Sequence, residues 1–279
     1  YGTAGFKASD EQPPWLGVTS KLGRSKPIML EHFKFVASNT RNTPKFCMPA
    51  PSMLHFRCDR DSLKKTYPDE KQFWADLAGA YQAEIRDLGA AGLTYLQIDD
   101  TSIANMCDPE VREHRRKLGD DPMKLPETYA KAVNMAIANR PKDMTVTVHT
   151  CRGNFKSTWL ASGGYDPVAE VCFNTLEVDG FFLEYDDERS GGFEPLRFMP
   201  KNRKVVLGLV SSKVPKLETK DALKRRIDEA AKYVALENLC LSPQCGFAST
   251  VHGNNLTEDD ERRKLALIRE VAEEVWGSR

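Results

Sequence analysis

The sequence lacks the features that mark membrane, secreted and nucleic-acid-binding proteins. No apolar run approaches the roughly 20 residues of a membrane-spanning helix, and the first residues have neither the basic flank nor the apolar core of a secretory signal. The 40 basic and 40 acidic residues cancel, which gives no overall attraction to nucleic acid or to an anionic membrane. The seven cysteines are odd in number and widely spaced, unlike a disulfide framework. We therefore expect a cytoplasmic protein with reduced thiols and with neither nucleic acid nor a membrane as its partner.

Glycine-rich phosphate loops are absent as well. No GxGxxG follows an expected strand, and GxxxxGK[ST] does not occur, so the usual signatures of nucleotide-binding folds are missing. The sequence does contain an alternation of short apolar runs with longer segments of helical periodicity. This alternation predicts parallel strands that are joined by helical crossovers.

The predicted elements cover most of the chain after residue 30. Strands are expected at residues 45–49, 93–99, 144–150, 180–185, 204–210 and 239–243. Helices are expected between the first two strands, at 109–118, 126–139 and 166–176, after Thr219, and after Thr257, which forms a capping box with Asp260. Residues up to about 30 show no sustained period and are expected to form a loop or an arm.

Six such units fit either a doubly wound sheet or most of an eight-stranded α/β barrel, the (β/α)8 TIM barrel. The absence of phosphate loops favours the barrel. We expect a single domain over residues 1–279. Two further barrel strands are expected before Tyr1, because an open barrel would expose unpaired backbone groups along its edges.

Polar and sulfur-bearing residues gather at the carboxyl ends of the expected strands, where parallel α/β proteins bind their ligands. Three of these ends carry His149 with Cys151, Glu184, and Cys245. One imidazole, two thiols and a carboxylate are all zinc ligands, and two soft sulfurs favour zinc over magnesium or calcium. A Zn²⁺ site is therefore one interpretation of these residues.

Each of these residues also has an ordinary interpretation. A free cysteine is most often a small buried residue, and Cys240, inside its strand, is assigned to packing. Glu184 could pair with Arg189 or belong to a solvated acidic loop. On spacing alone, a zinc site and a set of unrelated core residues explain the pattern equally well.

Four motifs in one order resemble the catalytic domain of cobalamin-independent methionine synthase. They read YLQIDD, HTCRGNF, FFLEYDD and LSPQCGF, at residues 95–100, 149–155, 181–187 and 241–247. The resemblance runs from about residue 28 to the C-terminus and is greatest to the short, single-barrel relatives of that enzyme. It implies an eight-stranded α/β barrel with Zn²⁺ held by His149, Cys151, Glu184 and Cys245.

The resemblance also implies a substrate and an activity. Asp99 matches an aspartate that holds the amino group of homocysteine, and Asp100, which stands where the family has glutamate, is a weaker candidate. Ser52 either touches the substrate or is a turn serine after proline. We expect Zn²⁺-dependent methyl transfer to a small thiol, homocysteine giving methionine, with Glu184 and Asp99 as the catalytic residues.

One departure from the family leaves the methyl donor open. The family's strand before the last zinc ligand ends in a histidine that is proposed to protonate the folate leaving group, whereas VVLGLVSSK contains none. His252, in the following loop, is either a substitute or a surface residue. Methyltetrahydrofolate or another carrier therefore remains a candidate donor. Alternatives are a thiol alkyltransferase of the epoxyalkane:coenzyme M type, a non-catalytic zinc-braced barrel, and a doubly wound protein without metal.

Overall fold

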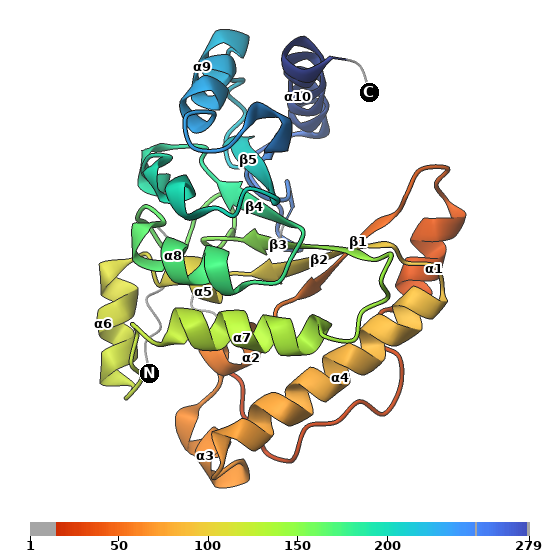
Figure 1. Ribbon diagram of the computed structural model, residues 1–279, viewed down its shortest axis with the longest axis vertical. Helices are drawn as coiled ribbons and strands as arrows, with labels where there is room; N and C mark the ends of the chain where they lie inside the picture. Colours follow the sequence, from red (N-terminus) through yellow and green to blue (C-terminus); the bar gives the residue numbers. More distant parts are fainter. Residues whose placement is uncertain (1–14, 249, 278–279) are drawn as a thin grey trace.

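The computed structural model describes residues 15–248 and 250–277, which form one parallel sheet covered by helices (Figure 1). The strands are β1 (Lys45–Pro49), β2 (Tyr95–Asp100), β3 (Thr145–Thr150), β4 (Gly180–Glu184), β5 (Lys204–Val210) and β6 (Leu239–Pro243). They lie side by side in their order along the chain, and every neighbouring pair is parallel. A doubly wound sheet would reverse its strand order, so that interpretation is wrong, and the α/β barrel class is confirmed.

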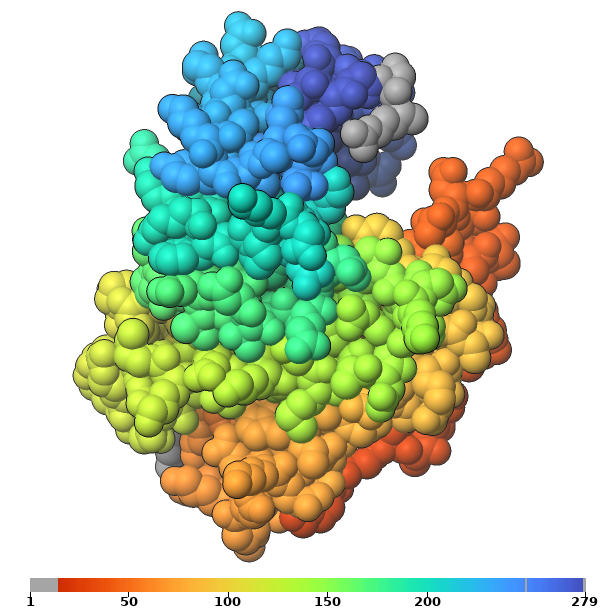
Figure 2. Space-filling model, in the orientation of Figure 1, coloured from red at the N-terminus to blue at the C-terminus, as the bar shows by residue number. Residues whose placement is uncertain are grey.

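Helices connect the successive strands. The helices that follow the order of the predicted long segments are α4 (Glu70–Ala90), α6 (Pro109–Lys117), α7 (Leu125–Ile137), α8 (Asp166–Thr175), α9 (Lys220–Ala230) and α10 (Glu258–Trp276). The remaining helices are α1 (Leu30–Ser38), α2 (Ser52–Arg57), α3 (Arg60–Thr66) and α5 (Ser102–Asn105), and the 3₁₀ turns are η1 (Glu188–Ser190), η2 (Glu194–Phe198) and η3 (Leu236–Asn238). Figure 2 shows the order of the chain on the surface, from red and orange at the bottom and the right through green to blue at the top.

The predicted strands and long helices are confirmed, with ends that differ by one or two residues at several elements. Thr257 and Asp260 form the expected capping box of α10. In the expected arm, residues 15–29 contain no helix or extended strand, and they are held by a backbone bridge between Leu16 and Cys58 and by side chains. Arg24, for example, forms an ion pair of 2.6 Å with Glu84 on α4. Residues 1–14 lie outside the described part of the chain, and the two further strands before Tyr1 stay a prediction.

The alternation of side chains along each strand positions the site. One face of the sheet carries the core under the helices, formed by pairs such as Leu96 and Ile98 on β2 or Val146 and Val148 on β3. The opposite face carries the polar residues, and the register sets Asp99 of β2 beside His149 of β3. Residues two apart share a face, so Glu184 lies on the same side as Phe182, the partner of His149. Within the described residues, no helix is both long and apolar enough to cross a membrane.

Candidate metal centre

Four of the predicted site residues meet at the carboxyl edge of the sheet. His149 is near the end of β3 and Cys151 directly follows that strand, Glu184 ends β4, and Cys245 follows β6. One ligand atom from each lies within 4.8 Å of the others, although the residues come from three separate parts of the sequence. The fold therefore brings together the set of donors that the sequence singled out.

The geometry of the sulfur and nitrogen atoms fits a tetrahedral ion. The Sγ atoms of Cys151 and Cys245 lie 3.6 Å apart, close to the roughly 3.8 Å expected for two sulfurs at about 2.3 Å from one zinc ion. Nδ1 of His149 lies 3.4 Å from the carbonyl oxygen of Phe182, which places its proton on that nitrogen. Nε2 is buried and faces the centre, 4.0 Å from Oε1 of Glu184, so it can bind a metal once it has lost its proton.

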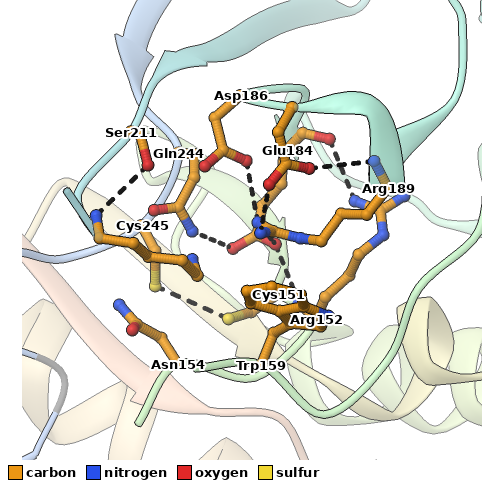
Figure 3. A network of polar contacts seen from close by, with 12 residues as sticks. Cys151, Arg152, Asn154, Trp159, Glu184, Asp186, Arg189, Ser211, Gln244 and Cys245 are labelled. Atoms are coloured by element: carbon orange, nitrogen blue, oxygen red, sulfur yellow. Dashed lines mark hydrogen bonds and ion pairs between the residues drawn. The ribbon is translucent and has the colours of Figure 1, made fainter. Parts of the chain in front are cut away.

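Glu184 is fully buried, and hydrogen bonds hold both of its carboxylate oxygens. The side-chain amide of Gln244 donates to Oε1 at 2.9 Å, and the backbone N–H of Arg152 donates to Oε2 at 3.1 Å (Figure 3). The hydroxyl of Ser212 in turn donates to the amide oxygen of Gln244. These contacts fix the carboxylate beside the two thiols while each oxygen keeps a lone pair for a metal.

Two arginines support the loops around the centre. Arg152 is buried, and its guanidinium donates to the carbonyl oxygens of Glu184 at 3.0 Å and Gly163 at 2.9 Å, which ties the loop after β3 to the end of β4. Arg189 bonds mainly to Asp186 and Asp187, at 2.9 and 2.8 Å. Its distance to Oε2 of Glu184 is 4.0 Å, so the alternative pairing of Glu184 with Arg189 is the weaker of its contacts.

In the metal-free protein, the surroundings of His149 and Cys151 raise the pKa of both side chains. Burial alone would lower the pKa of His149, but Cys245 and the carboxylates of Glu184 and Asp99 outweigh it and raise the pKa to about 9. The contact with Cys245, together with burial, holds the pKa of Cys151 well above its usual range. A metal that binds here must therefore displace protons, as in other thiolate sites.

Asp99 and Asp100 lie on opposite faces of β2. Asp99 is half-buried beside His149, and its Oδ1 accepts a hydrogen bond of 2.6 Å from Gln97; burial raises its pKa, which His149 partly offsets. Asp100 is fully buried and accepts from the hydroxyl of Ser52 and from the backbone N–H of Ile103 at 2.7 Å. Asp100 and Ser52 thus brace α2 and α5. Contact of Asp99, Asp100 or Ser52 with a substrate stays a prediction.

The remaining candidates lie outside the cluster. β5 carries no histidine. His252 is exposed, with its ring 5.3 Å from that of Phe155 in the loop after β3. Cys240 is half-buried on β6 and does not belong to the group of four ligands. Sequence reasoning missed the supporting roles of Arg152, Ser212 and Gln244, although Gln244 directly precedes Cys245.

Comparison with known proteins places this geometry in a family. The model of the cobalamin-independent synthase catalytic domain matches residues 55–274, and the chain belongs to that family. The Bacillus subtilis protein YxjH, described as uncharacterized, is 49% identical over 261 residues, which are 93% of this chain and 69% of the relative. The methionine synthase of Pyrococcus abyssi is 27% identical over 230 residues, 81% of this chain and 57% of that protein.

A solved structure supports the same assignment. A Listeria monocytogenes protein, provisionally described as a vitamin-B12 independent methionine synthase, superposes with a TM-score of 0.74 at 38% sequence identity. The match covers 94% of this chain and 74% of the Listeria chain. The resemblance inferred from the four sequence motifs is therefore confirmed at the level of family and fold.

Proposed function

We propose that the protein transfers a methyl group to the sulfur of homocysteine, giving methionine, at a Zn²⁺ site formed by His149, Cys151, Glu184 and Cys245. The observation that carries this proposal is the convergence of one imidazole, two thiols and one carboxylate at the edge of the sheet. Membership of the cobalamin-independent synthase family supports it. The spacing of the sulfurs and the buried Nε2 of His149 that faces them fit zinc better than a cation that prefers oxygen ligands.

Bound zinc would supply Lewis acidity, which lowers the pKa of a coordinated thiol so that it reacts as the thiolate. Glu184 is the ligand most suited to yield its place, because Gln244 and the backbone of Arg152 already hold its oxygens. Asp99, on the adjoining strand β2, is positioned beside His149 to accept hydrogen bonds from the ammonium group of the amino acid.

The chemical step is a displacement at the methyl carbon. The sulfur electron pair forms the new S–C bond, the bond between the methyl carbon and its carrier breaks, and the carrier leaves with that electron pair. The proton lost by the thiol passes to solvent, and the departing carrier takes up a proton from solvent if its chemistry requires one. The buried walls around Glu184 limit competing hydrolysis of the donor.

An assay with paired acceptors tests the proposal. Zinc-loaded protein is incubated with homocysteine or coenzyme M, each with methyltetrahydrofolate triglutamate, methylcobalamin or an epoxide, and the thioether products are identified by mass spectrometry. We expect methionine from homocysteine, loss of this product in Cys245→Ser, and retention in the matched control Cys240→Ser. A thioether product from coenzyme M but none from homocysteine would contradict the proposal. Methionine formation that continues after zinc is removed would contradict it as well.

A further inference from the structure

The loop after β3, which carries Cys151, contains a two-residue hairpin turn. The backbone groups of Phe155 and Thr158 exchange hydrogen bonds of 3.2 and 2.8 Å, and Lys156 and Ser157 between them have φ angles of 47° and 65°. Two positive angles are typical of a type I′ turn, whose central residues are usually asparagine or glycine. This left-handed conformation is unfavourable for lysine and serine, so it persists where other contacts hold it.

The loop after β6 supplies these contacts. Oδ1 of Asn254 accepts a hydrogen bond of 3.0 Å from the backbone N–H of Ser157, and the hydroxyl oxygen of Ser157 accepts one of 2.8 Å from the backbone N–H of Asn255. The rings of Phe155 and His252 lie edge to face, with their centres 5.3 Å apart. Each contact joins the loop after β3 to the loop after β6, so the turn depends on the second loop for its position.

The side-chain amide of Asn254 also leads towards Glu184. Its Nδ2 donates a hydrogen bond of 2.8 Å to the carbonyl oxygen of Ser212, in the loop after β5. The backbone N–H of Ser212 donates to the amide oxygen of Gln244 at 3.2 Å, and its hydroxyl donates to the same oxygen. Gln244 in turn holds Oε1 of Glu184 at 2.9 Å. One amide group therefore connects the turn to the carboxylate that the proposed function exchanges for the incoming thiol.

We infer that Asn254 is a positioning residue, which couples the attachment of the 155–158 turn to the capture of the thiol substrate. While Asn254 holds both the turn and Ser212, Gln244 is fixed and keeps its hydrogen bond to Glu184 as this carboxylate yields its place to the sulfur. Release of the turn weakens this support, so capture of the thiol becomes less favourable. The inference rests on the proposed function for the identity of the captured ligand.

The coupling must act in both directions, because a coupling free energy between two sites is reciprocal. If attachment of the turn favours capture of the thiol, capture of the thiol must stabilise the attached turn by the same factor. The turn has little stability of its own, since Lys156 and Ser157 are both left-handed, and its attachment can therefore respond to the ligand.

Two measurements on the same zinc-loaded samples test the inference. Hydrogen–deuterium exchange, read by mass spectrometry, follows the peptide that contains the 155–158 turn, and calorimetric titration gives the Kd for homocysteine. Asn254→Ala removes both contacts of the amide, whereas Asn254→Asp keeps an acceptor for Ser157 and loses the donor to Ser212. Asn255→Ala is the matched control, because Asn255 contributes its backbone N–H and its side chain is exposed.

In the wild type, saturating homocysteine should slow exchange in the turn by about fivefold or more. Asn254→Ala should raise the Kd for homocysteine by about fivefold, speed exchange in the turn, and remove the response of this exchange to homocysteine. Asn254→Asp should raise the Kd to a similar degree, while exchange in the turn without homocysteine stays close to that of the wild type. Asn255→Ala should match the wild type in both measurements, and all four proteins should contain equal zinc.

Faster exchange in Asn254→Ala with an unchanged Kd would show that Asn254 only holds the loop, and it would overturn the inference. Exchange in the wild-type turn that does not respond to bound homocysteine would overturn it as well, as would loss of zinc in Asn254→Ala. A wild type that contains zinc but does not bind homocysteine would instead contradict the proposed function itself.

Discussion

At the scale of single residues, the centre depends on how Glu184 is held. Its two oxygens accept from Gln244 and from the backbone of Arg152, and Ser212 fixes Gln244 in turn. Such a carboxylate can leave a metal without becoming an unpaired buried charge, because its hydrogen-bond donors remain. Gln244 is therefore a positioning residue for the exchange of ligands that the proposed function requires.

Replacement of Gln244 by leucine tests this role. The loss of a hydrogen bond to a charged group, worth about 1.5–3 kcal/mol, should raise the KM for the thiol by roughly tenfold or more. Ser212→Ala removes the second link and should have the same effect to a smaller degree. The zinc content should remain that of the wild type in both variants. A lowered kcat with an unchanged KM would contradict a role in the entry of the thiol.

Asp99 provides a second test at this scale. Asp99→Asn removes the charge that faces the amino group of the substrate, so the KM for homocysteine should rise by about tenfold. A thiol of similar length that lacks the amino group should react equally with wild type and variant. If both thiols are affected alike, Asp99 does not contact the ammonium group. Asp100→Asn is the matched contrast, since this buried residue should alter stability instead of KM.

At the scale of elements, close contacts between strands determine the positions of the ligands. Gly208 of β5 pairs with Glu184 of β4 and lies against the backbone of Gln244. A Cβ atom added at Gly208 would lie 2.7 Å from Cα of Gln244 and 2.8 Å from the carbonyl oxygen of Leu183. A side chain at this position would force apart the strand ends that carry Glu184 and Cys245.

The substitution Gly208→Ala should therefore lower the zinc affinity and destabilise the fold by about 1–3 kcal/mol. Gly79→Ala is the control, because a Cβ atom added at this glycine of α4 would meet no atom within 4 Å. Alanine is a better helix former, so the control should stabilise the protein by about 0.5–1 kcal/mol. Zinc titration and urea unfolding measure both effects. Equal stability and equal zinc affinity for Gly208→Ala and wild type would contradict this account of the strand contacts.

Some elements could be predicted from the sequence and others could not, and the difference lies in which contacts stabilise them. Strands such as β1 and β5 were predictable because their apolar runs are bounded by turn residues and lie next to strongly periodic helices. The short helices α2 and α5 were not, because they are braced by Asp100, a residue whose partners depend on the packed fold. The four candidate ligands were predictable as donors at strand ends, with the family motifs as support.

At the scale of the whole molecule, a buried histidine should govern part of the acid stability. His55 lies in an aromatic cluster, with its ring 5.1 Å from Trp74 and its Nδ1 3.0 Å from the hydroxyl of Tyr129. Burial, reinforced by Arg60 and Arg115, lowers its pKa to about 3, against which the attraction of Asp120 is weaker. The carboxylate of Glu70 lies 3.7 Å from Nε2 and is mostly exposed.

The direction of this pH effect on stability follows from the number of protons that the folded and the unfolded chain bind. Between pH 6.5 and about 3, the unfolded chain binds a proton at His55 that the folded chain does not. The free energy of unfolding should therefore fall by about 1.4 kcal/mol for each pH unit below 6.5 through this group alone. Urea unfolding at pH 7, 6 and 5 measures the free energy of unfolding at each pH. This free energy should fall less steeply with falling pH in His55→Gln than in the wild type. Parallel slopes would show that His55 is not the group responsible.

The central claim is that the four converging ligands form a zinc centre that accepts an external thiol. Zinc-edge X-ray absorption of the purified, zinc-loaded protein, recorded with and without saturating homocysteine, tests it most directly. We predict two sulfur neighbours from Cys151 and Cys245 without substrate, and a third sulfur in place of an oxygen neighbour when homocysteine is present. An unchanged shell of ligands at saturating homocysteine would contradict the claim and leave a metal site that only braces the fold.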